Sequence, residues 1–168
     1  MNFIVAVSQD FAIGKDNNLL FNLPSDLKYF KEKTLNKVVI MGDRTYLSLP
    51  KRPLPKRINI VLSKHGVEVP EGVIVVGSFE ELFKELENYD SKDVFVCGGA
   101  SVYNALMDYC EFAYITKIEK VVPADTYIEN IDKKSNWEIV ESSQKQTENG
   151  LDFKFVLYKN NSVKIFKG

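Results

Sequence analysis

The sequence predicts a single α/β domain, with one mostly parallel sheet, crossover helices and an antiparallel C-terminal edge. In the first two thirds of the chain, short apolar runs rich in Val, Ile and Phe alternate with helical patterns. Continuous apolar runs of this length are typical of strands buried on both faces of a parallel sheet. The last third has strand-like segments with no helical pattern between them, which favours antiparallel strands at that edge.

The predicted parallel strands are short apolar runs. They are Phe3–Val7, Val38–Met41, Ile58–Leu62, Val73–Val76 and Val94–Cys97. No internal repeat, low-complexity tract or long linker divides the chain. We therefore expect one domain over residues 1–160, followed by a tail, 161–168, that frays.

The first predicted helix opens at Asp26 and places Leu27, Phe30 and Thr34 on its inner face. The Asp26 carboxylate then lies beside an apolar surface, where desolvation raises its pKa and lets it hold or relay a proton near neutral pH. An Asp in the first turn of a helix is also a common cap for free backbone N–H groups. On this segment alone, both interpretations stay open.

Two further helices follow. The segment Ser78-Phe79-Glu80-Glu81 is a capping box, and apolar residues then repeat at helical spacing as far as Leu86. Ala100 to Met107 carries a similar apolar pattern. Each segment separates two predicted strands or follows one, as the helices of an α/β sheet do.

The last third contains three predicted strands, Phe112–Glu119, Trp137–Ser143 and Phe153–Tyr158. Glu148-Asn149-Gly150 separates the last two, and Asn-Gly is a strong signal for a tight hairpin. We therefore expect the sheet to end in antiparallel strands.

Composition narrows the classes of function. The chain has 168 residues, 45% hydrophobic and 27% charged, and a formal net charge of -1, so nothing global favours nucleic acid or an anionic membrane. The apolar opening is too short for a signal peptide or a membrane span. Cys97 and Cys110 make neither a disulfide framework nor a zinc site, and a single histidine, His65, rules out a two-His zinc motif. We expect a monomer in a reducing cytoplasm, without a metal.

Glycines follow two of the predicted strands. Gly98-Gly99 stands between a strand and a helix, and Gly42 precedes Arg44 in the same arrangement. Ser63-Lys64 follows a third strand and adds a hydroxyl and a cation. Ligands bind at the carboxyl ends of parallel strands, so these turns are a candidate seat for a dinucleotide with several phosphates. Tight turns and solvated surface charge are the alternative interpretation.

The loop Lys51 to Arg57 carries four cations around two prolines. A nucleic-acid patch is disfavoured because the loop is short and lacks interleaved aromatic residues. The prolines stiffen the loop, so Arg57 at the start of a strand is a candidate for forked binding of a carboxylate. Leu54 would add apolar contact beside it.

A set of short strings in this chain resembles, in order and spacing, the dihydrofolate reductase family, over Phe3 to about Tyr158. They are Ile13-Gly14, Asn22-Leu23-Pro24-Ser25-Asp26-Leu27, Phe30-Lys31, Val39-Ile40-Met41-Gly42, Arg52-Pro53-Leu54-Pro55, Arg57-Ile58-Asn59, Leu62-Ser63 and Gly98-Gly99. The resemblance implies an eight-stranded sheet flanked by four helices. It also implies reduction of 7,8-dihydrofolate to tetrahydrofolate by NADPH, and binding of antifolates such as methotrexate.

The resemblance implies roles for residues on the substrate side. Asp26 matches the family's single active-site acid, which binds the pteridine amino group and the adjacent ring nitrogen and favours protonation of the imine nitrogen. Thr116 would hydrogen-bond to Asp26, and Phe21 would lie near the proton path. Arg57 matches the partner of the substrate's α-carboxylate. The implied pocket walls are Val5, Ala6, Leu27, Phe30, Leu49, Leu54 and Thr116.

The resemblance also implies a cofactor side. Ala6, Ile13 and Gly14 match the nicotinamide region. The adenosine-phosphate region is matched by Gly42, Arg44, Thr45, Leu62, Ser63 and Lys64, and the pyrophosphate-to-nicotinamide stretch by Cys97, Gly98, Gly99, Ala100, Ser101, Val102 and Tyr103. In the family the double glycine carries a cis peptide. Asp16 to Phe21 matches a mobile loop, and Asp125 the acid that steadies it.

This chain departs from the family pattern at positions that bear on function. Leu20-Phe21 replaces a common Pro-Trp pair, and Phe21 has no indole N–H to anchor a water near Asp26. Asp43 stands where many members have a cation, so it would repel the 2′-phosphate of NADPH. Two other readings remain: a pteridine or pyrimidine reductase on the same scaffold, and a noncatalytic nucleotide-binding module in which Asp26 is only a cap.

Overall fold

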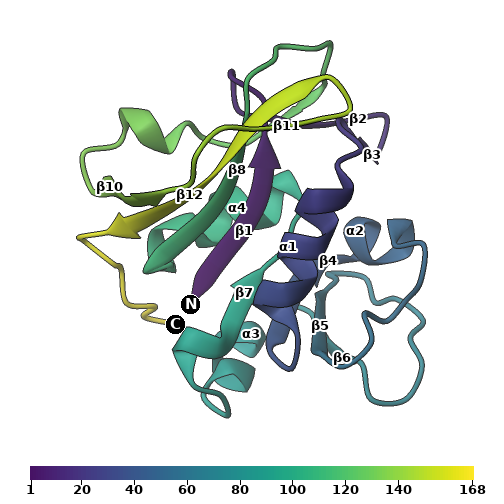
Figure 1. Cartoon of the computed structure of the whole chain (residues 1–168). Helices are drawn as coiled ribbons and strands as arrows, with labels where there is room; N and C mark the ends of the chain where they lie inside the picture. The colour runs from purple at the N-terminus through teal and green to yellow at the C-terminus, as the bar shows by residue number, and fades with distance from the viewer.

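The predicted sheet is present in the computed structural model, which describes residues 1–168. In sheet order its strands are β10 (Trp137–Ser142), β12 (Leu151–Asn160), β8 (Phe112–Ile118), β1 (Asn2–Val7), β7 (Val94–Val96), β4 (Val38–Gly42), β5 (Ile58–Leu62) and β6 (Ile74–Val76). A ninth strand, β11 (Gln146–Glu148), pairs with β12. From β8 to β6 all neighbours are parallel, whereas β12 is antiparallel to β8, β10 and β11, which confirms the predicted edge (Figure 1).

Four α-helices flank the sheet, as the resemblance implies. They are α1 (Pro24–Thr34), α2 (Asp43–Ser48), α3 (Phe79–Leu86) and α4 (Ala100–Leu106). Single 3₁₀ turns are η1 (Ser91–Asp93), η2 (Met107–Tyr109) and η3 (Ile131–Lys133). Figure 1 shows α1 in front of the sheet and α4 behind it. The longest helix, α1, has 11 residues, and no helix could cross a bilayer.

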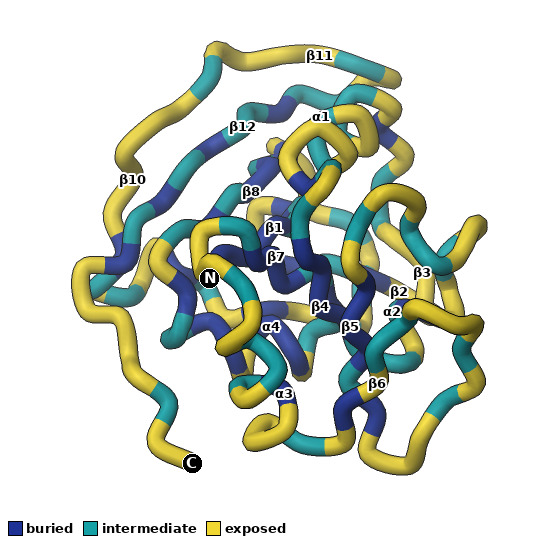
Figure 2. Tube along the Cα trace, turned by 90° about the horizontal axis from the view of Figure 1, so that it is seen from below, coloured by how far each residue is buried: buried dark blue, intermediate teal, exposed yellow.

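The core follows the alternation of side chains along the strands. Val38 and Ile40 point to one face of β4 and join the large cluster that includes Leu106 of α4. Val39 and Met41 point to the other face and pack in a second cluster. Strands β4 and β7 are buried on both faces, which is why they read as continuous apolar runs (Figure 2).

The predicted capping box is half present. The Ser78 side chain accepts a hydrogen bond from the Glu81 backbone N–H at 3.1 Å. The Glu81 carboxylate does not return to the N–H of Ser78 but accepts from that of Gly77, at 2.7 Å. The helix therefore begins where predicted, with a slightly different cap.

The Asn-Gly hairpin is confirmed, but its first strand is not the one expected. Asn149 and Gly150 have φ of 53° and 75°, the left-handed values that a tight hairpin turn requires. They join β11 to β12, with Glu148 opposite Leu151. Strand β10 pairs with β12 further along, because the chain leaves the edge after Ser142 and returns at Gln146.

A second, small sheet was not predicted. It consists of β3 (Asn18–Leu19), β2 (Ala12–Lys15) and β9 (Thr126–Tyr127). Strands of two to four residues are too short to show a period of two in the sequence. Gly14 lies in this sheet. It pairs with Thr126 of β9, and its carbonyl accepts a hydrogen bond from the Asp125 N–H.

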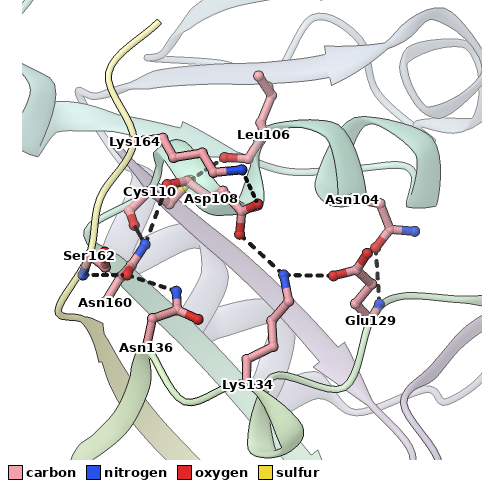
Figure 3. A network of polar contacts seen from close by, with 10 residues as sticks. All are labelled: Asn104, Leu106, Asp108, Cys110, Glu129, Lys134, Asn136, Asn160, Ser162 and Lys164. Carbon is pink, nitrogen blue, oxygen red and sulfur yellow. Dashed lines mark hydrogen bonds and ion pairs between the residues drawn. The ribbon is translucent and has the colours of Figure 1, made fainter.

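The tail 161–168 has no helix or strand but makes specific contacts with the domain. Lys164 pairs with the Asp108 carboxylate at 3.2 Å, and the Phe166 ring stacks on Phe83 with centroids 4.2 Å apart. Asn160, 2% exposed, lies at the centre of the same region and donates to the Cys110 carbonyl at 2.9 Å. Figure 3 shows how this polar network joins the end of β12 to η2. That the tail frays stays a prediction.

Candidate active site

Asp26 lies in the first turn of α1 and points its carboxylate at the sheet. The helix begins at Pro24, and the residue before it, Leu23, has no side-chain group that hydrogen-bonds to the free N–H groups of the first turn. Asp26 Oδ1 accepts a hydrogen bond from the Thr116 hydroxyl at 2.6 Å, and no backbone N–H donates to the carboxylate. Asp26 is therefore not a helix cap, because its acceptor atoms are turned away from the helix N-terminus.

Strand pairing explains why Thr116 is there. Thr116 on β8 is 1% exposed and lies opposite Ala6 on β1, so the two side chains share one face of the sheet. The predicted hydrogen bond between Thr116 and Asp26 is thus confirmed, and Ala6 is its neighbour on the sheet. Val5 and Ala6 are only partly buried, whereas the other four residues of β1 are buried.

Burial governs the protonation of Asp26. Removal of the carboxylate from water raises its pKa above the usual range, the Thr116 hydrogen bond lowers it, and the charge of Glu148 raises it further. The net direction is upward. A carboxyl group in this environment can take up a proton at a higher pH than an exposed Asp.

Sequence reasoning missed Glu148, which lies at the end of β11 in the β11–β12 hairpin and contacts the first turn of α1. Its carboxylate accepts from the Ser25 backbone N–H at 3.0 Å and from the Ser25 hydroxyl at 2.6 Å. The side chain of Asn149 also donates to the Asn22 carbonyl at 3.2 Å. These contacts join segments more than 120 residues apart, so no local pattern could have indicated them.

Arg57 has a free hydrogen-bonding group. Its guanidinium carbon lies 5.9 Å from the centre of the Phe30 ring, and burial lowers its pKa. Its Nε is buried without a hydrogen-bond partner, and it makes no ion pair. A buried donor of this kind favours an acceptor supplied by a ligand.

Asn59 is a second residue that sequence reasoning missed. Its side chain accepts from the Leu54 N–H and donates to the carbonyls of Leu54 and Arg57, all at 3.0–3.1 Å. It is 3% exposed and fixes the loop that carries both residues. The available signal was an amide inside an otherwise apolar strand, since a buried amide needs partners.

The predicted pocket walls fall into separate groups. Leu49 and Leu54 pack on the cluster formed by Val39, Met41, Tyr46 and Val61, together with Cys97. Phe21 and Ala6 pack on another cluster, around Leu23. Leu27, expected on the inner face of α1, is 56% exposed, and its place in a pocket wall stays a prediction; the α1 residues that contact the sheet include Asp26, at Thr116, and Tyr29, whose ring stacks on Phe155.

The two glycine turns adjoin each other. The Gly42 N–H donates to the Gly98 carbonyl at 2.9 Å, at the carboxyl ends of β4 and β7. The Gly98–Gly99 peptide is cis, as the resemblance implies. A Cβ on Gly99 would lie 3.2 Å from Thr45 Oγ1, a tight contact, and Gly98 has a φ of 122°, a conformation that residues with a side chain rarely adopt.

The remaining cofactor-side residues differ in exposure. Arg44, Lys64 and Ser101 are exposed, and Arg44 and Lys64 have no acidic group within 4.0 Å. The Ser63 hydroxyl is buried and donates to Asp43 at 2.8 Å. Val102 and Tyr103 lie in the core, where the Tyr103 hydroxyl donates to the Ile4 carbonyl at 2.6 Å.

The loop from Asp16 to Phe21 is tied at its start. Asp125 Oδ2 accepts from the Asp16 N–H at 2.9 Å, and the Asp125 N–H donates to the Gly14 carbonyl at 3.1 Å. The expected contact between Asp125 and this loop is present. The hydrogen bond from the Asp16 N–H, together with one from the Thr126 hydroxyl, lowers the pKa of the Asp125 carboxyl.

Two features lie apart from this arrangement. No group of three or more His, Cys, Asp or Glu side chains could hold a metal ion. A surface cavity of about 470 Å³ is lined by Tyr46, Arg52, Glu68, Val69 and Pro70, none of which is a predicted site residue.

Comparisons with known proteins agree with this geometry. The sequence profile of the family described as dihydrofolate reductase matches residues 1–160. The chain is 38% identical over 167 residues to the dihydrofolate reductase of Bacillus subtilis, covering 98% of this chain and 97% of that protein. It is 37% identical over 137 residues to that of Haemophilus influenzae, covering 82% and 81%. A solved dihydrofolate reductase from Enterococcus faecalis, complexed with NADP(H) and RAB-propyl, superposes with a TM-score of 0.84 at 33% identity and 95% coverage of both chains.

Proposed function

The chain belongs to the dihydrofolate reductase family, and from this premise we propose which of its residues carry the reaction. It reduces 7,8-dihydrofolate to 5,6,7,8-tetrahydrofolate with NADPH, and it binds antifolate inhibitors. The observation that carries the assignment of residues is the partly buried Asp26 carboxylate, held by Thr116 and turned toward the sheet.

We assign Asp26 the binding and protonation of the pteridine. Its carboxylate accepts hydrogen bonds from the pteridine amino group and the adjacent ring nitrogen. The raised pKa lets Asp26 take up a proton at a higher pH than an exposed Asp, and a protonated imine nitrogen is the better hydride acceptor. In this proposal Asp26, which is held by Thr116, acts at the imine nitrogen through water rather than by direct contact.

We assign Arg57 the α-carboxylate of the substrate. The buried, unpartnered Nε fits this role, because a carboxylate can accept from two guanidinium N–H groups at once. Asn59 positions the loop, and Leu54 and Leu49 supply apolar surface beside it. Phe30, under the guanidinium, would contact the aromatic part of the substrate.

The residues at the strand ends fit a dinucleotide. Gly42 and Gly99 are partly exposed at the strand ends, with the buried Gly98 packed between them, and Arg44 and Lys64 are cations without a protein partner. NADPH, when bound, supplies the hydride. In this proposal Ala6, Ile13 and Gly14 border its nicotinamide, and the stretch from Cys97 to Tyr103 borders its pyrophosphate, with Val102 and Tyr103 contributing backbone because their side chains are buried.

Other parts of the proposal concern the surroundings of the reaction. The loop from Asp16 to Phe21, tied by Asp125, closes over the nicotinamide region, and Phe21, which packs on the cluster around Leu23, offers no hydrogen-bond donor to a water near Asp26. We also propose that the protein acts as a monomer in the cytoplasm, since its sequence has no heptad pattern and its two cysteines form no disulfide.

A direct assay tests the proposed function. The purified protein is mixed with NADPH and dihydrofolate, and NADPH absorbance is followed, with methotrexate binding measured by calorimetry. We expect turnover that methotrexate abolishes. Absence of both turnover and methotrexate binding would refute the assignment. A pteridine or pyrimidine reductase is not favoured, because such an activity does not account for Asp26, Phe30, Leu54 and Arg57 together.

A further inference from the structure

Asp43 and Ser63 face each other at the carboxyl ends of two neighbouring parallel strands. Gly42, the last residue of β4, pairs with Leu62, the last residue of β5, so the residues that follow each strand lie side by side. The Ser63 hydroxyl donates to Asp43 Oδ2 at 2.8 Å. Ser63 is only 3% exposed, so the carboxylate is held in place by a buried group.

The Asp43 carboxylate can accept further hydrogen bonds. No Lys, Arg or His lies within 4.0 Å of it, and its Oδ1 receives no hydrogen bond from the protein. An ionised carboxylate accepts several hydrogen bonds, so this group can take another donor. The single hydroxyl proton of Ser63 is already committed to Asp43, which leaves Ser63 without a donor for an anion.

A second carboxylate lies at the same edge of the sheet. Val76, the last residue of β6, pairs with Leu62, and the next residue, Gly77, donates its N–H to Glu81 at 2.7 Å. A Cβ on Gly77 would be 3.6 Å from Glu81 Oε2 and 3.8 Å from the Ser63 carbonyl. The edge therefore presents two fixed carboxylates, from Asp43 and Glu81, next to the exposed cations Arg44 and Lys64.

NADPH and NADH differ only at the adenosine ribose, where one has a phosphate monoester and the other a hydroxyl. A carboxylate accepts a hydrogen bond from a hydroxyl but repels a phosphate, which carries roughly -1.5 to -2 charges near neutral pH. Building on the proposed function, which puts the adenosine phosphates at this edge, we propose that Asp43 is a specificity-determining residue. Positioned by Ser63, it lowers the preference for NADPH so far that NADH is a second hydride donor.

The four charged or polar groups have different roles in this proposal. Arg44 and Lys64 attract phosphates of either cofactor and so retain use of NADPH. Asp43 discriminates between the two ribose substituents, and Ser63 acts through Asp43 rather than as a phosphate ligand. In this proposal Ser63 therefore has a different role from the one that the resemblance implies.

Binding of two small fragments tests this proposal without turnover. Adenosine 2′,5′-bisphosphate and adenosine 5′-monophosphate are titrated calorimetrically into wild type, Asp43→Asn and, as a control with the same charge change on the opposite edge strand, Glu138→Gln. Asn keeps an acceptor for Ser63, so the local fold is retained. We expect Asp43→Asn to bind the bisphosphate about tenfold more tightly, with the monophosphate unchanged, because removing one unit charge removes repulsion of a doubly charged group.

Salt and steady-state kinetics complete the test. The gain in Asp43→Asn should shrink at high ionic strength, since screening weakens the repulsion. The ratio of kcat/KM for NADPH over NADH should rise about tenfold in Asp43→Asn and stay at the wild-type value in Glu138→Gln. Ser63→Ala, which releases the carboxylate, should shift the ratio in the same direction but less.

Three outcomes would overturn the proposal. They are an unchanged ratio in Asp43→Asn, an equal change in the affinity of both fragments, and binding of neither fragment. If the ratio is unchanged while the protein still reduces dihydrofolate with NADPH, only the role of Asp43 is refuted. If no dihydrofolate is reduced with either cofactor, the proposed function fails instead, and the fragment affinities still decide the role of Asp43.

Discussion

The Thr116 hydroxyl lies 2.6 Å from Asp26 Oδ1 and makes the only hydrogen bond that the protein donates to this carboxylate. It joins a helix and a strand that are 90 residues apart in the sequence. Because a hydrogen bond to the charged form lowers a pKa, Thr116 opposes the effect of burial on Asp26. The balance between the two sets the pH at which Asp26 takes up its proton.

Replacing Thr116 by Val removes this hydrogen bond while keeping the shape of the side chain. We expect the pKa of Asp26 to rise further, because burial and Glu148 then act without opposition. The pH profile of kcat/KM should shift to higher pH. The control is Thr116→Ser, which keeps the hydroxyl and should keep the profile. A shift to lower pH in Thr116→Val would contradict the role given to this hydrogen bond.

Arg57→Leu should weaken binding of dihydrofolate by roughly 2–5 kcal/mol, the usual effect of removing one partner of a buried charge pair. Binding of a dihydropteridine that lacks the glutamate tail should hardly change. Lys51→Leu, an exposed cation in the same loop, serves as the matched control. Calorimetric titration with both ligands measures the difference, and an equal loss for both would show that Arg57 does not read the carboxylate.

Protonation of Asp26 also links stability to pH. Its folded-state pKa is raised above the usual 3.8, so its contribution to stability is full below that pH and is lost as pH rises through the folded-state pKa. Asp26→Asn removes a charge that is costly to bury. We expect this variant to unfold at higher urea than wild type at about pH 7, and the difference to shrink toward about pH 4. If the stability advantage of Asp26→Asn over wild type grew toward low pH, the predicted sign of the pH dependence would be contradicted.

Asn160 tests the network that holds the end of β12. Its buried side chain donates to the Cys110 carbonyl and accepts from Asn136 and from the Ser162 N–H, each at 2.9 Å. Asn160→Ala leaves these partners unsatisfied, so we expect a loss of roughly 2–3 kcal/mol in the free energy of unfolding. The neighbouring, exposed Asn161 makes no side-chain hydrogen bond, and Asn161→Ala should change stability by less than about 0.5 kcal/mol. Urea unfolding of both variants measures these losses, and equal losses in Asn160→Ala and Asn161→Ala would contradict the role given to Asn160.

Much of the fold could be predicted because burial leaves a period in the sequence. The apolar run Val38–Met41 indicated β4 almost to the residue, since a strand buried on both faces is mostly apolar, and Ile58–Leu62 indicated β5 although Asn59 interrupts its apolar residues. Asn149-Gly150 indicated the hairpin because few other residues adopt two left-handed conformations in succession. The strands of the small sheet were missed because two to four residues carry no period.

The site was predictable where chemistry depends on residue type and not where it depends on contacts across the fold. Asp26 and Arg57 stood out because an acid in an apolar segment and a cation in a stiff loop are chemically distinctive. Glu148 was missed because its partner Ser25 is 123 residues away. Asn59 was missed although its partners, Leu54 and Arg57, lie within five residues of it, because the buried amide in this strand was not used as a signal. Helical spacing did not indicate that Leu27 is 56% exposed, since spacing alone does not say how a helix is rotated on its sheet.

The central claim is that Asp26 organises the proton for pteridine reduction, and the pH dependence of Asp26→Asn tests it most directly. The rate of dihydrofolate reduction is measured at saturating NADPH across the pH range for wild type and variant. We predict that Asp26→Asn loses most of its activity at neutral pH and regains part of it in acid, where more of the substrate is already protonated. Wild-type activity of the variant at neutral pH would contradict the account.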